Sequence, residues 1–296
     1  MRIPVFLSAA ALMCALWASP VLAVSLFTDG FESYNLGGLD ANLSGGPNQA
    51  PNGGPGNPWF GLFPPNGQVV TAEHGVTPHS GNQMVRGKNF SGAADGDQNW
   101  LNIAYRYNNG QPFANNVGLD YWFYDVNGQG DANVKDYMAL GYYNTAGTVP
   151  YTQDYPAASN GNLNTGVTQI ERLSLGMYNG GSGWDTTKYQ ARVVGATDGS
   201  GLISNGWYNL PITRSVGWHH ARIAVGADDL VSFYIDDMNT PLLTHAEVQQ
   251  YGFNVLEMNL NTGTQTAYFD DVSLTPEPAS LLLLAVGLWP FLHRRR

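Results

Sequence analysis

GWHHARIAVGADDLVSFYIDD, residues 217–237, contains two runs in which apolar and polar side chains alternate. Alternation with a period of two is the pattern of a β-strand that buries one face. The runs cover residues 218–225 and 230–236, and Asp228 and Asp229 lie in the short segment between them. Because Asp is common in tight turns, the stretch predicts two strands joined by a turn.

The same alternation recurs along the chain in short runs bounded by Gly, Asn, Asp and Pro. Further strands are predicted at residues 69–73, 100–107, 118–126, 137–143, 170–178, 189–194, 255–260 and 267–274. A helical pattern is confined to residues 244–251, where one or two turns are expected. About ten strands separated by turn residues predict an all-β protein, built as a two-sheet jelly-roll sandwich.

Two long polar segments, residues 37–67 and 144–166, interrupt this pattern. Long ordered loops in compact domains are often functional. Disordered insertions have a similar composition. Both interpretations stay open.

The N-terminus has the layout of a secretory signal peptide. Met1 and Arg2 give a basic start, an apolar run covers residues 3–17, and small residues follow up to Ala23. This order of basic, apolar and small residues directs export. We expect cleavage after Ala23, so residues 1–23 are predicted to be removed.

The C-terminus carries a second targeting pattern. Pro276, Glu277 and Pro278 precede an apolar stretch over residues 279–292, and three arginines end the chain. The stretch is shorter than the roughly 20 residues of a typical spanning helix, and the arginines orient it with its end in the cytoplasm. A plain membrane anchor is one interpretation of residues 276–296.

The order Pro-Glu-Pro, short apolar helix and basic end also resembles the PEP-CTERM sorting tail of Gram-negative bacteria. The resemblance implies that an exosortase-type membrane peptidase recognises the tail and cuts near Pro-Glu-Pro. Before that step, the short C-terminal helix would hold the chain in the membrane.

Residues 24–275, between these ends, are enough for one large β-domain. Glycine is abundant at 36 residues, charged residues make up only 12%, and the single cysteine, Cys14, falls in the predicted signal peptide. This composition is typical of extracellular β-proteins. The mature domain therefore has no cysteine for a disulfide, a nucleophile or a metal site.

The mature domain is strongly acidic. The chain has 13 Lys and Arg against 23 Asp and Glu, and removing Arg2, Glu277 and the three C-terminal arginines leaves 9 against 22. Such a domain repels phosphate backbones, so nucleic acid is not an expected partner. Calcium and neutral glycans suit this net charge better.

Three stretches together resemble the concanavalin A-like (laminin G/lectin/glucanase) sandwiches of secreted proteins. They are DGFESY at residues 29–34, the stretch at 217–237, and YFDDVSL at 268–274. The resemblance covers most of residues 24–275 and implies that the first and last strands pair. It specifies the fold better than the function, which must be argued from a site.

In many proteins of that fold, acidic residues of the first and last strands hold a structural calcium ion. The matching positions are Asp29, Glu32, Asp270 and Asp271. Calcium takes about six to eight oxygen ligands, including carboxylates. Strand alternation places Asp270 and Asp271 on opposite faces, so one of that pair is the expected ligand. The alternative is that these acids cap turns.

Residues 125–136, DVNGQGDANVKD, resemble a dockerin-type calcium loop that begins at Asp125 and ends at Asp136. Gln129 stands where a carboxylate is usual, and a strand rather than a helix is predicted to follow. A hairpin with Asn127 and Gly128 in its turn is the favoured interpretation.

The sequence lacks the spacings that mark common hydrolases. Glucanases of the resembled fold carry Glu-x-Asp-x-x-Glu on one strand, which aligns an acid and a nucleophile, and no such spacing occurs here. Gly-x-Ser-x-Gly and His-Glu-x-x-His are absent as well. His219 and His220 are neighbours on a predicted strand and point to opposite faces, with Trp218 expected in the core.

Aromatic rings are the residues that stack on the apolar faces of sugars. Trp59, Trp184 and Trp207 lie beside Gly, Asn, Pro or Asp, and we expect them in loops that bind a ligand. Packing within the loops is the alternative. Trp100 and Trp122 fall on predicted strands and are expected in the core.

These patterns favour an exported protein of the cell surface, outer membrane or extracellular matrix of a Gram-negative bacterium. We expect a non-catalytic carbohydrate-binding or structural role, with extracellular polysaccharide as the partner and calcium as a structural cofactor. A polysaccharide hydrolase or lyase, with a site built from scattered residues, is the alternative. A surface component without a small ligand is a third.

Overall fold

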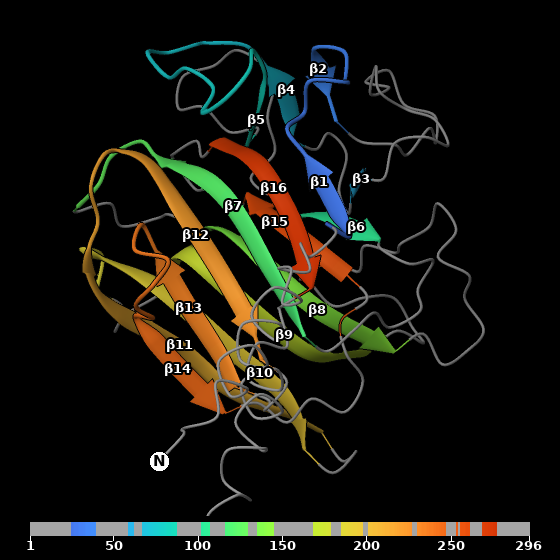
Figure 1. Cartoon of the computed structure of the whole chain (residues 1–296), viewed down its shortest axis with the longest axis vertical. Coiled ribbons are helices and arrows are strands. Elements are labelled where there is room, and N and C mark those ends of the chain that lie inside the picture. Colours follow the sequence, from blue (N-terminus) through green and yellow to red (C-terminus); the bar gives the residue numbers. More distant parts are fainter. Residues whose placement is uncertain are drawn as a thin grey trace, which may run out of the picture. The chain divides into compact units, whose positions relative to one another are not determined.

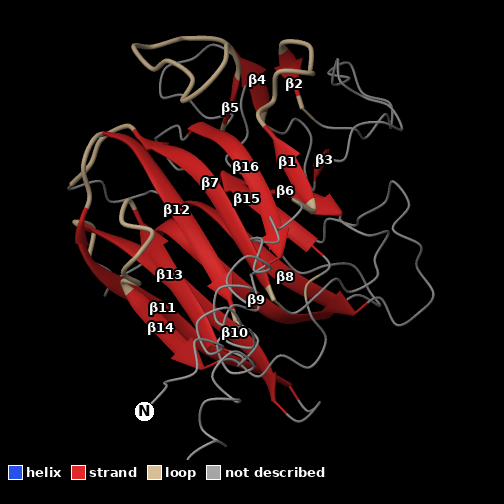
Figure 2. Ribbon diagram, in the orientation of Figure 1, coloured by secondary structure: helices blue, strands red, loops and turns tan. Residues whose placement is uncertain are grey.

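The computed structural model describes residues 25–39, 59–61, 67–87, 102–106, 116–129, 135–144, 168–178, 185–197, 201–226, 230–246, 253, 255–260 and 268–276. Every regular element in these residues is a β-strand (Figure 2). No helix in this part of the chain has the length and apolar character needed to cross a membrane. The prediction of an all-β protein is therefore confirmed.

The chain divides into Ser25–Glu277 and a second unit made of Met1–Val24 and Pro278–Arg296. The predicted signal peptide with Ala23, and the tail from Glu277 and Pro278 onward, lie outside the described residues. Pro276 is partly exposed and is the last residue of the final strand.

The described strands form two antiparallel sheets, which lie as two layers in Figure 1. Sheet A has the order β14 (Leu243–Ala246), β13 (Leu230–Ile235), β12 (Gly217–Val225), β7 (Val117–Asp125), β16 (Tyr268–Pro276), β5 (Met84–Arg86), β4 (Gln68–Val70) and β2 (Gly37–Gly38), with β1 (Phe27–Asp29) paired to β16. Sheet B has the order β11 (Gly201–Thr213), β10 (Lys188–Thr197), β9 (Thr168–Tyr178), β8 (Lys135–Asn144), β15 (Val255–Leu260), β6 (Asn102–Arg106) and β3 (Trp59–Gly61).

The core lies between the inner faces of the two sheets. Every second residue of β7 and β12 is buried there, including Phe123 and Ile223. Sheet B contributes Leu140 and Leu175 to the same core. The hydroxyl of Tyr121, on β7, also donates a hydrogen bond across the core to the carbonyl oxygen of Leu175. Buried and partly exposed residues therefore alternate along these strands with the same period of two as the apolar and polar residues of the sequence.

The first and last strands pair, as the resemblance implied. Phe27 lies opposite Leu274, and Asp29 lies opposite Val272. The pairing of β16 with β7 is interrupted between Asp270 and Ser273, and Asp271 has a positive φ of 47° there. This bulge falls where β16 changes its partner on one edge from β5 to β1.

The ten predicted strands correspond to β4, β6, β7, β8, β9, β10, β12, β13, β15 and β16. The prediction of helical turns at residues 244–251 is wrong for the first three residues, because Leu243–Ala246 is strand β14. Strands β2 and β3 lie within the segment 37–67 that reads as a loop, and the polar segment at 145–166 is outside the described residues.

The favoured hairpin at residues 125–136 is also wrong. Strand β7 belongs to sheet A and β8 to sheet B, so the connection crosses from one sheet to the other. Gly128 has a positive φ of 62° within it. Turn residues alone do not separate a hairpin from a crossing between layers, since both reverse the chain.

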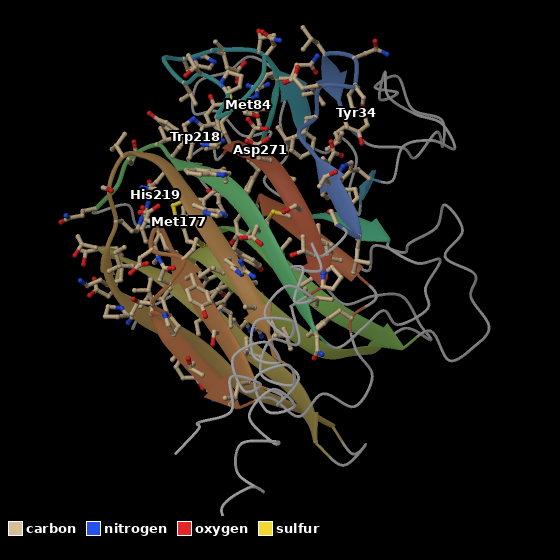
Figure 3. The ribbon with its side chains drawn as sticks, in the orientation of Figure 1. Tyr34, Met84, Met177, Trp218, His219 and Asp271 are labelled. Atoms are coloured by element: carbon tan, nitrogen blue, oxygen red, sulfur yellow. The ribbon has the colours of Figure 1, made fainter. Side chains whose placement is uncertain are left out.

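Neighbouring residues of β12 point to opposite sides, as expected (Figure 3). His219 is buried against Phe123 and Tyr189, whereas Trp218 and His220 are partly exposed. Trp218 donates its indole N–H to the carbonyl oxygen of Thr77. The expectation of Trp218 in the core is therefore wrong, and it is a histidine that points inward.

Candidate functional site

The outer face of sheet B carries a row of residues in one register across all seven of its strands. Each residue is the Cα partner of the next, so the row crosses the sheet at right angles to the strands. From β3 to β11 the row consists of Phe60, Ala104, Glu257, Ala139, Ser174, Arg192 and Trp207.

An aromatic cluster lies at the β11 end of this row. Trp207 stacks on Tyr178, with ring centroids 4.2 Å apart and planes inclined by 6°. Tyr137 meets the Trp207 ring edge-on at 4.9 Å, and the Arg192 guanidinium carbon lies 5.8 Å from the Trp207 centroid. The rings come from β8, β9 and β11, so the sheet register brings together side chains far apart in sequence.

Gly176 lies beside the base of the Tyr137 side chain, where there is no room for a Cβ atom. Its φ is +145°, and a Cβ atom there would lie 2.5 Å from the carbonyl oxygen of Asp136 and 2.8 Å from Cα of Tyr137. A side chain at position 176 would therefore push against β8 beside the Tyr137 ring. Only glycine fits both the backbone conformation and this space.

Gln190 connects the aromatic cluster to polar groups at the edge of the sheet. Its Oε1 accepts a hydrogen bond from the backbone N–H of Tyr178 at 2.8 Å. Its amide nitrogen donates to the carbonyl oxygens of Asp185 and Lys188 and to Oδ1 of Asn209. Because Gln190 is only 1% exposed, this network fixes the positions of the groups around it.

The outer part of this region is accessible to solvent. Asn209 and Asp185 are exposed, and Tyr178, Lys188 and Arg192 are partly exposed, while Trp207 behind them is 9% exposed. We call the set Tyr137, Tyr178, Gln190, Arg192, Trp207 and Asn209 the Trp207 face. It combines a supported aromatic surface with amide and guanidinium groups.

Two buried polar side chains lie further along the same row. Ser174 is fully buried, and its hydroxyl has no hydrogen-bond partner among the described residues. Glu257 is 4% exposed, and burial raises the pKa of its carboxyl group to about 8. A carboxyl group with such a pKa is mostly protonated at neutral pH, so Glu257 can donate a proton there.

The predicted calcium ligands lie at the β1–β16 end of sheet A, where they accept hydrogen bonds from protein groups. Asp29 accepts from the backbone N–H of Phe31, the hydroxyl of Tyr34 and the indole of Trp59, at 2.7–2.8 Å. Burial raises the pKa of Asp29, although these three hydrogen bonds oppose the shift.

The other three predicted ligands hold the segment at residues 79–83 against β16 and β1. Asp270 accepts from the backbone N–H groups of His79 and Ser80, and Asp271 contacts Nδ1 of His79 at 2.6 Å. Glu32 accepts from the backbone N–H groups at positions 82 and 83. Burial raises the pKa of Asp270 to about 6. Figure 3 shows Asp271 at this end of the sheet.

These hydrogen bonds to nearby N–H and side-chain groups are typical of acidic residues that stabilise turns. Calcium would need several carboxylate oxygens directed at one point. Within the described ranges, no group of three or more His, Cys, Asp or Glu side chains is placed to hold a metal ion. The four acids, as placed, offer no common set of oxygens, and calcium stays a prediction.

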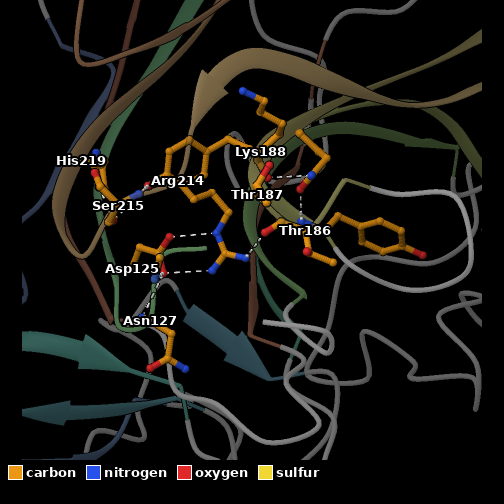
Figure 4. Close-up of polar contacts among 12 residues, drawn as sticks. Asp125, Asn127, Thr186, Thr187, Lys188, Arg214, Ser215 and His219 are labelled. Atoms are coloured by element: carbon orange, nitrogen blue, oxygen red, sulfur yellow. Dashed lines mark hydrogen bonds and ion pairs between the residues drawn. The ribbon is translucent and has the colours of Figure 1, made fainter. Parts of the chain in front are cut away.

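The dockerin-type calcium loop would begin at Asp125, and in the structure the carboxylate of Asp125 forms an ion pair. Asp125 is 1% exposed, and both its oxygens accept hydrogen bonds from Arg214, at 2.9 and 3.0 Å. Oδ1 also accepts from the backbone N–H groups of Asn127 and Gly128. Figure 4 shows this pair, which joins β7 to the segment between β11 and β12. Residues 130–134 lie outside the described part.

A Ser-His-Asp arrangement, which no spacing in the sequence indicates, lies next to this ion pair. His219 Nδ1 lies 2.8 Å from Oδ2 of Asp236, and Nε2 lies 3.3 Å from Oγ of Ser215. However, Nε2 is closer to the carbonyl oxygen of Ser215, at 2.8 Å. Burial lowers the pKa of His219, but the bonds to Asp236 and Ser215 and the nearby carboxylates raise it overall.

The 2.8 Å contact between Nε2 and the carbonyl oxygen of Ser215 decides the role of His219. A carbonyl oxygen only accepts, so Nε2 must carry a proton to bond with it, and Nδ1 must carry one to bond with Asp236. A doubly protonated imidazole cannot take a proton from the Ser215 hydroxyl. The arrangement therefore ties the β11–β12 turn to the end of β13 and does not activate a nucleophile.

The tryptophans predicted to bind ligand lie in different environments. Trp59 is completely buried on β3 and packs against Phe27 and Phe31, so the expectation of a loop position is wrong. Trp207 is on strand β11. Trp184 lies just before the described residue Asp185 and outside the described part.

The outer face of sheet A is covered at one end by its own chain. His79, from the segment that follows β4, stacks on Trp122 at 3.6 Å, and His220 stacks on Trp122 at 4.9 Å. Trp122 therefore lies outside the core, contrary to expectation. Since these rings already pack on each other, the Trp207 face is the better candidate for a ligand.

No protein-family model matches this chain, and no curated protein matches it either. Among solved structures, the chain is similar to the T. cruzi calreticulin globular domain, at 9% identity and a TM-score of 0.49, over 89% of this chain and 92% of that one. It is also similar to an endo-β-1,4-glucuronan lyase from the fungus Trichoderma reesei, at 12% identity and a TM-score of 0.46, over 86% and 96%.

A third similar structure is a carbohydrate esterase from the Shiga toxin-encoding bacteriophage phi24B. The identity is 15% and the TM-score 0.44, over 86% of this chain and 99% of that one. These identities and scores are too low to assign an activity. The function must be argued from the residues themselves.

Proposed function

We propose that this chain is an exported protein whose β-sandwich, a jelly roll of the concanavalin A-like kind, binds extracellular polysaccharide without cleaving it. The observation that carries the proposal is the Trp207 face. It places a stacked aromatic pair beside exposed and partly exposed hydrogen-bonding side chains on the outer face of one sheet.

The chemistry of this face suits a sugar. Aromatic rings attract the apolar faces of sugar rings, and amides bond the hydroxyl groups. Tyr178 is partly exposed and backed by Trp207, so its ring is held in place before a ligand arrives. Asn209 is exposed beside it and is held by Gln190. Preorganised groups lose little conformational entropy on binding.

The destination is proposed from the two ends of the chain. Residues 1–23 fit a signal peptide cleaved after Ala23, and residues 276–296 fit a PEP-CTERM tail. An exosortase-type peptidase would be the processing partner. The mature domain would then act at the cell surface, outer membrane or extracellular matrix of a Gram-negative bacterium.

Glu257 supports a second candidate, a polysaccharide hydrolase or lyase. Its pKa of about 8 is that of a general acid, and it shares a row with Arg192 and Trp207. A hydrolase of the usual kind needs a second carboxylate about 5–10 Å away. Among the described side chains on this face, Glu257 is the only carboxyl group within the strands. Binding is therefore the better proposal.

The full chain can be tested on a panel of purified polysaccharides, in the presence of calcium and of a chelator. Binding without release of reducing ends or of unsaturated sugars supports the proposal. Release of either product supports the enzyme instead, and Glu257→Gln should then abolish it. A loss of binding with chelator would give calcium a role. Failure to bind any polysaccharide in both conditions contradicts the proposal.

A further inference from the structure

Gln190 is the buried centre of a hydrogen-bond network whose outer members are Asp185 and Asn209. These two residues are exposed, whereas Gln190 is only 1% exposed. The Gln190 amide also bonds the backbone of Tyr178, so the polar groups and the aromatic pair share one support. The directions of these hydrogen bonds decide what the exposed groups offer to a ligand.

The backbone fixes the orientation of the Gln190 amide. Its Oε1 accepts from the N–H of Tyr178 at 2.8 Å, and a backbone N–H can only donate. Its Nε2 donates to the carbonyl oxygens of Asp185 and Lys188 at 3.0 and 2.7 Å, and a carbonyl oxygen can only accept. An exchange of Oε1 and Nε2 would break all three bonds, so Gln190 presents a donor to Asn209.

The amide of Asn209 is oriented in turn by two donors. Its Oδ1 accepts from Nε2 of Gln190 and from the backbone N–H of Asp185, each at 3.3 Å. The oxygen is therefore engaged inside the network, and the NH2 group is the part of this exposed side chain that remains to meet a ligand. Toward a ligand, Asn209 is a hydrogen-bond donor.

Asp185, next to Asn209, has the opposite character. Its Oδ1 accepts from the hydroxyl and from the backbone N–H of Thr187, at 2.6 and 2.9 Å. These two hydrogen bonds lower the pKa of Asp185, so its carboxylate is charged at neutral pH. They also hold the carboxylate in place. Its second oxygen, Oδ2, can only accept.

Lys188 balances the charge of Asp185. It lies three residues further along the chain, and its ammonium group donates to Oγ1 of Thr213 at 2.9 Å. Its positive charge also contributes to the lowered pKa of Asp185. One negative and one positive group at the same edge do not select a ligand by net charge. The directions of the hydrogen bonds are left to discriminate.

A donor next to an acceptor suits the hydroxyl groups of a sugar. A hydroxyl both accepts and donates, so neighbouring hydroxyls can accept from Asn209 and donate to Asp185. A carboxylate or sulfate group only accepts, and it would face the Asp185 carboxylate with no proton between them. A site that bonds hydroxyl groups rejects a group that leaves its polar atoms unpaired.

We infer that Asp185 and Asn209 determine the specificity of the Trp207 face and select a neutral polysaccharide through a pair of neighbouring hydroxyl groups. This inference rests on the proposed function, since it names the chemical class of the ligand at the same face. The Tyr178 ring supplies the stacking contact, and Gln190 sets the position of the two polar groups relative to that ring.

The ligand test uses matched polymers. Soluble starch, galactomannan and xyloglucan are each compared with their carboxymethyl derivative, and a hydroxyethyl derivative of equal substitution controls for added bulk. Binding of the full chain is measured at neutral pH by affinity electrophoresis. We expect a neutral polymer to bind at least about tenfold tighter than its carboxymethyl derivative, with the hydroxyethyl derivative close to the unmodified polymer.

Two variants test the residues. Asn209→Asp keeps the oxygen that accepts inside the network but replaces the exposed donor by an acceptor. Asp185→Asn keeps the oxygen that bonds Thr187 but removes the charge. Each should weaken binding of the neutral polymer by about tenfold. Asp237→Asn is the matched control, because Asp237 is also exposed and its Oδ1 accepts from the backbone N–H two residues further on, at Asn239. It should leave the affinity unchanged.

Equal or tighter binding of the carboxymethyl derivative overturns the inference and leaves polysaccharide binding standing. An equal loss with the hydroxyethyl derivative overturns it as well, because bulk and not hydrogen-bond direction would then discriminate. Unchanged affinity in a folded Asp185→Asn also contradicts it, and this variant serves if Asn209→Asp does not fold. A lack of binding to every polymer of the series and of the panel overturns the proposed function too.

Discussion

Trp207 and Tyr178 lie face to face, with ring centroids 4.2 Å apart, although β10 separates their strands. Rings on strands two apart in a sheet reach each other only if the side chains lean across the strand between them. The Arg192 guanidinium, from β10, lies 5.8 Å from the Trp207 centroid. The pair therefore forms part of a packed surface that exists before any ligand binds.

The glycine beneath this surface gives the first prediction. Gly176→Ala should destabilise the fold by about 1–3 kcal/mol more than Gly217→Ala, because only the first Cβ would collide with backbone. The two glycines have similar φ angles, +145° and +140°, and nothing lies within 4 Å of a Cβ at position 217. Urea unfolding of both variants measures the difference. Equal losses would mean that the close approach to β8 costs nothing.

The buried ion pair between the sheets gives the second prediction. Arg214→Met leaves the carboxylate of Asp125 buried without its partner and should lower the free energy of unfolding by about 3–5 kcal/mol. Adding Asp125→Asn removes the charge but keeps an oxygen for the backbone N–H groups of Asn127 and Gly128. The double variant should recover much of the loss in urea unfolding. No recovery would show that the arginine acts by packing and not by charge.

His219 gives a prediction about pH. The raised pKa of His219 means that the folded state holds its proton more tightly than the unfolded chain. Its contribution to stability is then complete below the ordinary histidine pKa of about 6.5 and is lost as the pH rises through the folded value. The loss of stability in His219→Gln should be largest at acid pH and should shrink as the pH rises. A difference that stays constant with pH, in melts of both proteins, would contradict the double donation.

Glu257 gives a second prediction about pH, in which stability again falls as the pH rises. Burial raises the pKa of Glu257 from 4.5 to about 8, so the folded state keeps a proton that the unfolded chain loses. Stability should fall as the pH rises between these two values and level off above them. Glu257→Gln should therefore gain stability over the original chain across this window, on the order of a few kcal/mol at pH 8. An unchanged difference between pH 5 and pH 8 would mean that Glu257 is not desolvated.

Strand positions could be predicted from the sequence because burial in this fold follows alternation closely, as in β7 and β12. Strand β11 was missed because Gly, Asn and Pro interrupt its pattern, and two register shifts occur in its pairing with β10. Those residues form bulges in an edge strand and not a loop. The prediction of a loop position for Trp207 is wrong for the same reason.

The site could be predicted only in part. Trp207 was identified from its residue type, but Tyr178, Arg192 and Gln190 join it through strand pairing, which residue spacing does not show. Trp59 was misplaced because its neighbours suggest a turn, whereas its indole bonds to Asp29, a residue far away in the sequence. The same long-range contact gives Asp29 a partner that no local pattern reveals.

The central claim is that the Trp207 face binds polysaccharide, and one comparison tests it most directly. Tyr178 and Tyr234 are both partly exposed tyrosines on outer faces, one on sheet B and one on sheet A. Binding of the full chain and of Tyr178→Ala and Tyr234→Ala to the polysaccharide selected from the panel is measured by calorimetry. The account predicts that Tyr178→Ala loses about tenfold or more in affinity while Tyr234→Ala keeps it. Unchanged affinity in a folded Tyr178→Ala, or equal losses in both variants, would contradict it.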